Sequence, residues 1–306
     1  MRYGLTIDTS RRIPDVVAQV RAVRDAGLAS ATVSHIFGYD ALTLLGIVGA
    51  QVPDVELVTG VVPTYTRHPI AMAQQALTVQ AASGGRLTLG IGLSHQIVIE
   101  GMYGYSFDKP ARHMREYLHA LMPLLRHEQV SYEGETLTAR TIGPLEIDAP
   151  APDVLVAALA PTMLRLAGTL ADGTITWMTG PATLADHIVP SITRAAADAG
   201  RRAPRVACSL PVCVTNDPDG ARERAGKVFS IYGTLPSYRA MLDREGAEGP
   251  GAVAVVGDED AIARQLTTVA DAGVTEFAAA PYGSREERER TFTLLTQLAR
   301  STESSR

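Results

Sequence analysis

The chain has 306 residues, of which 46% are hydrophobic and 5% aromatic, and its 28 basic and 33 acidic side chains give a net charge of −5. That length is typical of one large α/β barrel or of two ordinary domains. No basic stripe with interleaved aromatics is present, which argues against a nucleic-acid partner, and the longest apolar run, Ala41–Ala50, is too short to span a bilayer.

Strand-like and helix-like stretches alternate along the whole chain. The strand candidates are Tyr3–Thr9, Ser30–Phe37, Val55–Pro63, Arg86–Ser94, Val154–Leu159, Gly173–Gly180, Arg205–Thr215 and Glu276–Tyr282. The helix candidates are Pro14–Ala26, Pro69–Ala82, Ala111–Arg126, Pro161–Leu170, Ala182–Ala199, Glu259–Ala272 and Arg285–Arg300. This alternation predicts an α/β fold, a (β/α)8 TIM barrel, because its strands are apolar on both faces and need a surrounding ring of helices.

We predict a single domain over residues 1–306. Two segments of it are insertions beyond the strands and helices of a minimal barrel. Gln129–Thr141 alternates around Glu133-Gly134, which predicts a small hairpin inserted before the fifth strand. The stretch Lys227–Gly251 is a long excursion after the seventh strand. Excursions at this position often form lids or wall off a pocket.

The two cysteines favour a reducing compartment. Cys208 and Cys213 are five apart in one strand candidate, so they point to opposite faces and cannot pair with each other. The N-terminus "MRYGLTIDTS" begins with strand-like alternation and has no signal-peptide pattern. We therefore expect a cytoplasmic protein without disulfides.

The carboxyl ends of the strand candidates are poor in ionisable side chains. These ends form the mouth at which barrel enzymes place their chemistry. Here they offer mainly glycine, alanine, small polar groups and a few aromatic residues, whereas a hydrolase or aldolase would show several carboxylates or a lysine. Such a mouth suits a broad, flat, apolar ligand that brings its own reactivity, which is a flavin-like cofactor.

The segment "GRLTLGIGLSH" supplies two of these glycines, Gly90 and Gly92, followed by Ser94 and His95. Both glycines alternate onto one side, where a planar ring would lie against bare backbone; the alternative is a bulge or tight turn that merely needs glycine. A dinucleotide fingerprint is excluded, because the third glycine is missing and we expect a long loop to follow instead of a helix.

A second segment predicts a place for a phosphate. The fifth strand candidate ends in Ala157–Ala160, and Pro161 stands where the first residue of a helix would be. Small residues leave that helix start open, so the N–H groups near Thr162 and Met163 can hold a phosphate; tight packing of the helix on the sheet is the alternative.

Each of the other candidate side chains at the strand ends has two possible roles. His35 can hydrogen-bond a flavin edge or relay a proton, or it is a buried histidine with a backbone partner. Trp177 is either core or pocket wall, and Arg67 is either part of a helix entry or an anion contact. The histidines never fall in a metal-ligand spacing, so no metal site is predicted.

The chain resembles the bacterial-luciferase-like flavin monooxygenases, especially the branch that uses the deazaflavin coenzyme F420. The motifs that carry the resemblance are "VTGVVPTYTRHPIAMAQQALTVQAASGGR", "GRLTLGIGLSHQIVIEGMYGYSFDKPARHMREYLHALMPLL", "AALAPTMLRLAGTLADGTITW" and "VVGDEDAIARQLTTVADAGVTEF". Together they run through most of the chain in the order of the family.

The resemblance implies a TIM barrel, usually a homodimer, with the cofactor at the mouth. It implies a non-prolyl cis peptide at Gly60–Val61 behind the ring, with His35, Gly90 and Gly92 beside the ring. The positions that match the phosphate contacts of the family are Ala158, Leu159, Ala160 and Thr162.

Two positions depart from the sugar-phosphate dehydrogenases of the deazaflavin branch. Leu93 stands where those enzymes have an acid after the Gly-x-Gly, and their tryptophan after the second-strand histidine is absent, with Phe37 and Tyr39 as the nearest aromatics. A more apolar substrate than a sugar phosphate is therefore expected.

These observations give three hypotheses. The first is an F420-dependent oxidoreductase that transfers a hydride to or from a small organic molecule, with His35 or His95 as proton donor and Ser94 near the cofactor. Under this first hypothesis, one wall of the substrate pocket is formed by Tyr65, Tyr103 and Trp177. The second is an FMN-dependent monooxygenase supplied with reduced flavin by a separate reductase. The third is a non-catalytic flavin-binding barrel.

Overall fold

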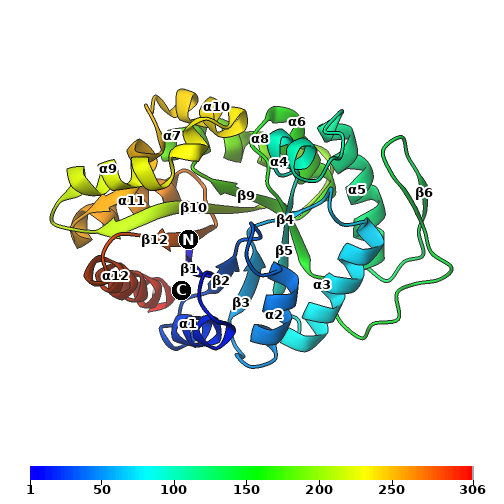
Figure 1. Ribbon diagram of the computed structural model, residues 1–306, viewed down its shortest axis with the longest axis horizontal. Coiled ribbons are helices and arrows are strands. Elements are labelled where there is room, and N and C mark those ends of the chain that lie inside the picture. Colours follow the sequence, from blue (N-terminus) through cyan, green and yellow to red (C-terminus); the bar gives the residue numbers. More distant parts are fainter. Residues whose placement is uncertain (305–306) are drawn as a thin grey trace.

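The computed structural model describes residues 1–304, and within them eight parallel strands close into a barrel (Figure 1). The barrel strands are β1 (Arg2–Thr6), β2 (Ser30–Val33), β3 (Glu56–Thr59), β5 (Leu87–Gly92), β8 (Asp153–Val156), β9 (Gly173–Trp177), β10 (Arg205–Val214) and β12 (Glu276–Pro281). Each pairs with the next, and β10 closes the ring because it pairs with both β9 and β12. The predicted (β/α)8 fold is confirmed.

Helices surround the barrel between these strands (Figure 1). They are α1 (Ile13–Asp25), α2 (Ala41–Gly49), α3 (Pro69–Ser83), α5 (Pro110–Leu125), α6 (Pro161–Leu170), α7 (Pro181–Thr183), α8 (Val189–Asp198), α9 (Pro218–Val228), α11 (Glu259–Asp271) and α12 (Arg285–Ser304). Several begin with proline in the first turn, where its missing N–H costs no helical hydrogen bond. The predicted helix Ala182–Ala199 is in fact α7 and α8 joined by a π-helical turn, η1 (Leu184–Ile188).

The structure corrects the sequence predictions at the mouth. The third strand ends at Thr59 and resumes as β4 (Val62–Pro63), with the cis peptide Gly60–Val61 between the two parts. A short helix, α4 (Gln96–Gly101), follows β5 almost directly, so the expected long loop was wrong. The apolar run Ala41–Ala50, which is tested from the sequence only as a membrane span, contains α2. The N-cap of α2 is Asp40, whose side chain accepts a hydrogen bond from the N–H of Thr43.

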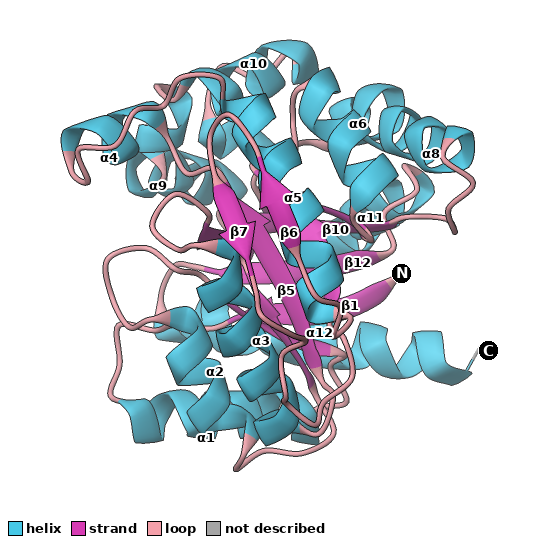
Figure 2. Ribbon diagram, turned by 90° about the vertical axis from the view of Figure 1, so that its right-hand side faces the viewer, coloured by secondary structure: helices cyan, strands magenta, loops and turns pink. Residues whose placement is uncertain are grey.

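Both predicted insertions have structure of their own. β6 (Ser131–Glu133) and β7 (Thr138–Arg140) form the expected antiparallel hairpin. The excursion Lys227–Gly251 contains η2 (Ser230–Gly233) and α10 (Pro236–Glu245). It leads through η3 (Pro250–Val253) to β11 (Val255–Gly257), which pairs with the end of β10. In Figure 2, α10 and α4 lie on the same side of the barrel, away from the N-terminus.

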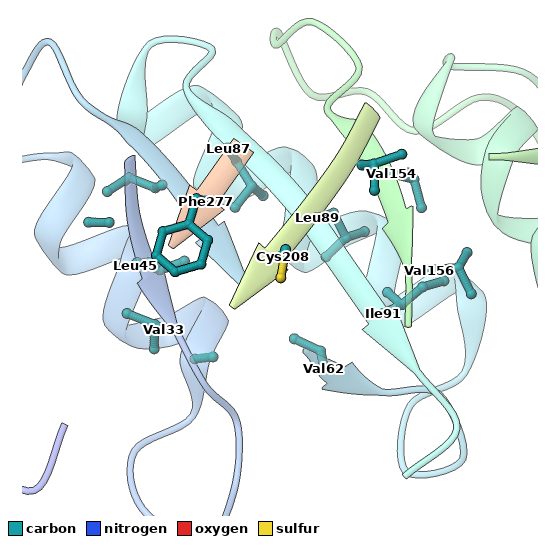
Figure 3. Close-up of a cluster of buried hydrophobic side chains, with 14 of the residues drawn as sticks. Val33, Leu45, Val62, Leu87, Leu89, Ile91, Val154, Val156, Cys208 and Phe277 are labelled. Carbon is teal, nitrogen blue, oxygen red and sulfur yellow. The ribbon is translucent and has the colours of Figure 1, made fainter. Parts of the chain in front are cut away.

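The main apolar core lies between the outer faces of the strands and the helices. Leu45 of α2, Leu89 and Ile91 of β5, and Phe277 of β12 belong to it, as does Cys208, and all are buried (Figure 3). Both cysteines are buried and free. A second, smaller cluster of Val58, Leu155, Ile175 and Ala207 fills the barrel interior, with Val61 and Ala157 packed against it.

A layer of charged side chains closes the amino-terminal end of the barrel. The guanidinium of Arg205 donates to Glu276 at 2.6 Å, to Glu56 at 2.6 Å and to Asp153 at 2.9 Å. Arg2 pairs with Glu56 at 2.9 Å and with Glu276 at 3.0 Å. These residues stand at or near the first positions of their strands, so this end is filled by ion pairs and the opposite end is left for ligands.

Candidate cofactor and substrate site

An open cleft of about 490 Å³ lies at the carboxyl-terminal mouth. Its lining residues come from three connections: the β2–α2 loop, the β4–α3 loop and the segment after α4. They are His35, Ile36, Phe37, Gly38, Asp40, Thr66, Arg67 and Tyr103. Three candidate residues named from sequence, His35, Arg67 and Tyr103, therefore share one cleft.

His35 is turned so that one ring nitrogen meets the start of α2. Its Nδ1 accepts from the backbone N–H of Ala41 at 3.2 Å, so the neutral ring carries its proton on Nε2. Burial lowers the pKa of His35, Arg67 lowers it further, and Asp40 only partly opposes them. His35 is thus a neutral hydrogen-bond donor through Nε2–H near pH 7.

Asp40 and Arg67 form an ion pair beside His35. One carboxylate oxygen of Asp40 accepts from the N–H of Thr43 at 2.8 Å and caps α2, and the other accepts from Arg67. The Nε of Arg67 donates to Gln75 at 3.0 Å. Sequence reasoning missed Asp40, although an aspartate directly before an apolar run is an N-cap pattern.

The two glycines of the fourth barrel strand have a packing reason. A Cβ on Gly90 would lie 1.9 Å from the carbonyl oxygen of Thr59, and the backbone of Gly90 exchanges hydrogen bonds with the hydroxyl of that threonine. A Cβ on Gly92 would lie 2.7 Å from the Val61 side chain. Close approach of neighbouring segments thus gives both glycines a packing reason, and contact of either glycine with a cofactor ring stays a prediction.

Replacing Gly90 by alanine is expected to destabilise the fold by about 2–3 kcal/mol, because backbone must move to admit the methyl group. Gly226 in α9 is a matched control, since a Cβ there meets nothing within 4 Å and its φ is not positive. In urea unfolding, the free energy of unfolding of Gly226→Ala should equal or slightly exceed that of wild type. Equal stabilities for the two variants would contradict the packing reason.

The start of α6 is open, as the sequence predicts. Its N-cap Ala160 makes no side-chain cap, and the first helical hydrogen bond runs from the N–H of Leu164 to the carbonyl of Ala160 at 3.0 Å. Ala160 and Thr162 are exposed, Leu159 is half-buried, and Ala158 is only 1% exposed. The N–H groups of Thr162 and Met163 therefore lie in an unpartnered helical first turn, which suits an anion.

A series of packed aromatic rings connects the excursion after β10 to the mouth of the barrel. The ring of His95 lies 5.6 Å from that of Tyr238, which lies 5.1 Å from Tyr232, and Tyr232 packs edge-on against Trp177 at 5.7 Å. Phe229 packs on the other side of Trp177. The structure therefore connects two predicted residues, His95 and Trp177, through tyrosines that the sequence did not single out.

Tyr65 lies in a separate stack. Its ring is 4.0 Å from His113 and 5.3 Å from Phe107, and burial raises its pKa to about 12. Ser94, between β5 and α4, is half-buried and has a φ of 61°. Neither residue is among those that line the cleft, so their contact with a ligand stays a prediction.

Arg67, which the sequence offers as an anion contact, and Arg112 of α5 are both in ion pairs. Arg67 pairs with Asp40 and Arg112 pairs with Glu135. Within the described residues 1–304 no cluster of three or more His, Cys, Asp or Glu is arranged to hold a metal ion. None of the helices in that range combines the length and apolarity needed to cross a membrane.

The chain belongs to the luciferase-like monooxygenase family, whose family model matches residues 2–276. It is 26% identical over 261 residues to the 5,10-methylenetetrahydromethanopterin reductase of Methanolobus tindarius, covering 84% of this chain and 78% of that protein. A further relative, an uncharacterised protein of Mycobacterium bovis, is 30% identical over 205 residues, and the match spans 62% of this chain and 60% of the relative.

Two solved structures share the fold. The coenzyme F420-dependent tetrahydromethanopterin reductase from Methanopyrus kandleri superposes with a TM-score of 0.81 at 22% identity, over 97% of each chain. The FMN complex of a type II Baeyer–Villiger monooxygenase from Pseudomonas putida gives 0.76 at 17% identity, over 98% of this chain and 97% of that one. Relatives and structural neighbours thus include both F420-dependent oxidoreductases and FMN monooxygenases.

Proposed function

We propose that the protein is an F420-dependent oxidoreductase that transfers a hydride between the deazaflavin and a small organic substrate. The observation that carries this proposal is the cleft at the barrel mouth, where His35 presents a neutral N–H donor and Phe37 and Tyr103 add apolar surface. The relatives named as F420-dependent or methanopterin reductases support the choice of cofactor. Leu93, in place of an acid, argues against a sugar phosphate.

The residues at the mouth fit such a cofactor. The open first turn of α6 offers the N–H groups of Thr162 and Met163 to a phosphate, and Val61 and Ala157 form an apolar floor above the barrel interior. The bound deazaflavin supplies a carbon centre that accepts or gives a hydride. The protein needs only to hold the ring, exclude water and present a donor to the substrate.

The rim of the mouth favours an apolar substrate. Phe37 is 65% exposed and Tyr103 42%, and both line the cleft. Further exposed apolar side chains on the same loops, on α4 and on the excursion are Ile36, Tyr39, Ile97, Met102, Tyr105, Val228 and Ile231. We therefore propose a substrate with an apolar body and one oxygen that accepts a hydrogen bond from His35.

An FMN-dependent monooxygenase is the second candidate, and the structural neighbour in complex with FMN favours it. Titration of the purified protein with F420 and, separately, with FMN distinguishes the two, because both cofactors are fluorescent. We expect saturable binding of F420 and much weaker binding of FMN. Tight binding of FMN with no binding of F420 would contradict the proposal and support the monooxygenase.

We further propose that the protein is a cytoplasmic homodimer and that a separate reductase supplies the reduced cofactor. The two free, buried cysteines support a reducing compartment. Light scattering on the eluted protein tests the dimer, for which a mass of twice the 32.5 kDa chain is expected.

A further inference from the structure

The two ring nitrogens of His35 have different surroundings. Nδ1 accepts from the N–H of Ala41, a first-turn N–H of α2 that has no partner inside the helix. Nε2 makes no hydrogen bond to the part of the chain that the structure describes, and the ring borders the cleft. The helix start therefore fixes which nitrogen is left to carry the proton.

Asp40 would disturb this arrangement if its carboxylate were unpaired. Its Oδ2 lies 3.7 Å from Nδ1 of His35, close enough for a free carboxylate to draw a proton onto that nitrogen. The guanidinium of Arg67 forms an ion pair with the same Oδ2 of Asp40, and the Nε of Arg67 donates a hydrogen bond to Gln75. The guanidinium thus occupies the carboxylate oxygen that would compete for an Nδ1 proton.

We propose that Asp40 and Arg67 are positioning residues that keep His35 in its Nε2–H form, so that the cleft holds a fixed donor for an acceptor oxygen of the substrate. Asp40 caps α2 and so also places the Ala41 N–H that Nδ1 accepts. The charged groups that face His35 are Asp40 on its own loop and Arg67 on the β4–α3 loop, and Tyr103 after α4 lines the same cleft. Only the identity of the acceptor rests on the function proposed above.

With its proton on Nε2, neutral His35 is predicted to donate a hydrogen bond to a carbonyl oxygen of the substrate. A neutral donor polarises a carbonyl that receives a hydride without adding a positive charge to the site. The lowered pKa of His35 agrees with this, since burial and Arg67 both disfavour its charged form. The donor is then present throughout the range above pH 6.5 and is exchanged for an imidazolium only as the pH falls below that value.

Nitrogen-15 NMR of the histidine rings in the full-length protein, without cofactor, tests the assignment. For wild type we expect His35 neutral with its proton on Nε2 from pH 6.5 to 8. In Arg67→Met, Asp40 is released, so the proton moves to Nδ1 or the ring becomes charged and its pKa rises. The double variant Asp40→Asn/Arg67→Met should return the Nε2–H form, because asparagine still caps α2. Arg112→Gln, which breaks an ion pair with Glu135 outside the cleft, should leave the His35 signals unchanged.

A wild-type spectrum with the proton on Nδ1, or His35 signals that do not respond to Arg67→Met in a folded protein, would overturn the proposal. Where Arg67→Met does not fold, a proton on Nδ1 in either the wild-type or the double-variant spectrum would still overturn the proposal. In turnover, Arg67→Met should lower kcat about 10-fold with a smaller change in KM, and the pH profile should gain an inflection near the usual histidine pKa. Because the spectra need no cofactor, binding of FMN in place of F420 would reject the proposed function and leave the tautomer result standing.

Discussion

Replacing His35 by alanine is expected to lower kcat about 100-fold on an F420-dependent substrate, with little change in the stability of the barrel. The side chain lies on a loop at the mouth, and its only hydrogen bond within the described residues is the one Nδ1 accepts from Ala41. Its removal therefore deletes the donor in the cleft and leaves the core intact. Steady-state kinetics together with thermal unfolding of the two proteins measure both effects.

His119 offers a matched control for this experiment. It lies exposed on α5, where its ring stacks on Tyr132 of the inserted hairpin, away from the residues that line the cleft. His119→Ala should keep wild-type turnover, and His35→Gln, which retains an N–H donor, should recover part of the lost rate. Full activity in His35→Ala would show that the donor is elsewhere, with His95 as the next residue to test.

Replacing Arg205 by methionine is expected to lower the free energy of unfolding by about 3 kcal/mol or more. Arg205 is the shared partner of Glu56, Asp153 and Glu276 in the charged layer at the amino end of the barrel. Its loss leaves these carboxylates with fewer partners in a partly buried layer. Urea unfolding at pH 7 measures the change, and Arg202→Gln is the control, because that side chain is 62% exposed and should cost less than about 1 kcal/mol.

The same layer predicts a pH dependence. Burial raises the pKa of Glu276, but Arg205 and Arg2 outweigh it and hold that pKa below its usual range. A carboxylate whose folded pKa lies below its unfolded pKa, about 4.3, stabilises the fold above that pH and loses this effect as the pH falls through the folded pKa. The difference in stability between wild type and Arg205→Met should therefore shrink from pH 5 to pH 3. A constant difference would mean that the ion pairs contribute little.

Regular elements were predictable wherever a local pattern fixes them. The helix Pro161–Leu170 was predicted to the residue, because proline marks its first turn and the strand before it is uniformly apolar. The hairpin of β6 and β7 was likewise found from alternation around a turn. The second strand was predicted too long, since Ile36 and Phe37 continue its apolar pattern although they lie exposed beside the cleft.

The arrangement of the site depends on contacts that no local pattern contains. Asp40 and Arg67 are 27 positions apart, and they meet only because the second and third barrel strands are neighbours. Tyr232 lies 55 positions after Trp177 in the sequence, yet the two rings pack against each other. Sequence alone could therefore name His35, Arg67 and Trp177 as candidates, whereas Asp40 and the contacts that join these residues required the fold.

The central claim is that the mouth of this barrel holds a planar redox cofactor. A crystal structure of the protein soaked with F420 tests it most directly. We expect the ring in the cleft beside His35 and above Val61, with the cofactor phosphate at the start of α6 near Ala160 and Thr162. Density for the cofactor at another surface, with the cleft closed over packed side chains, would contradict the account.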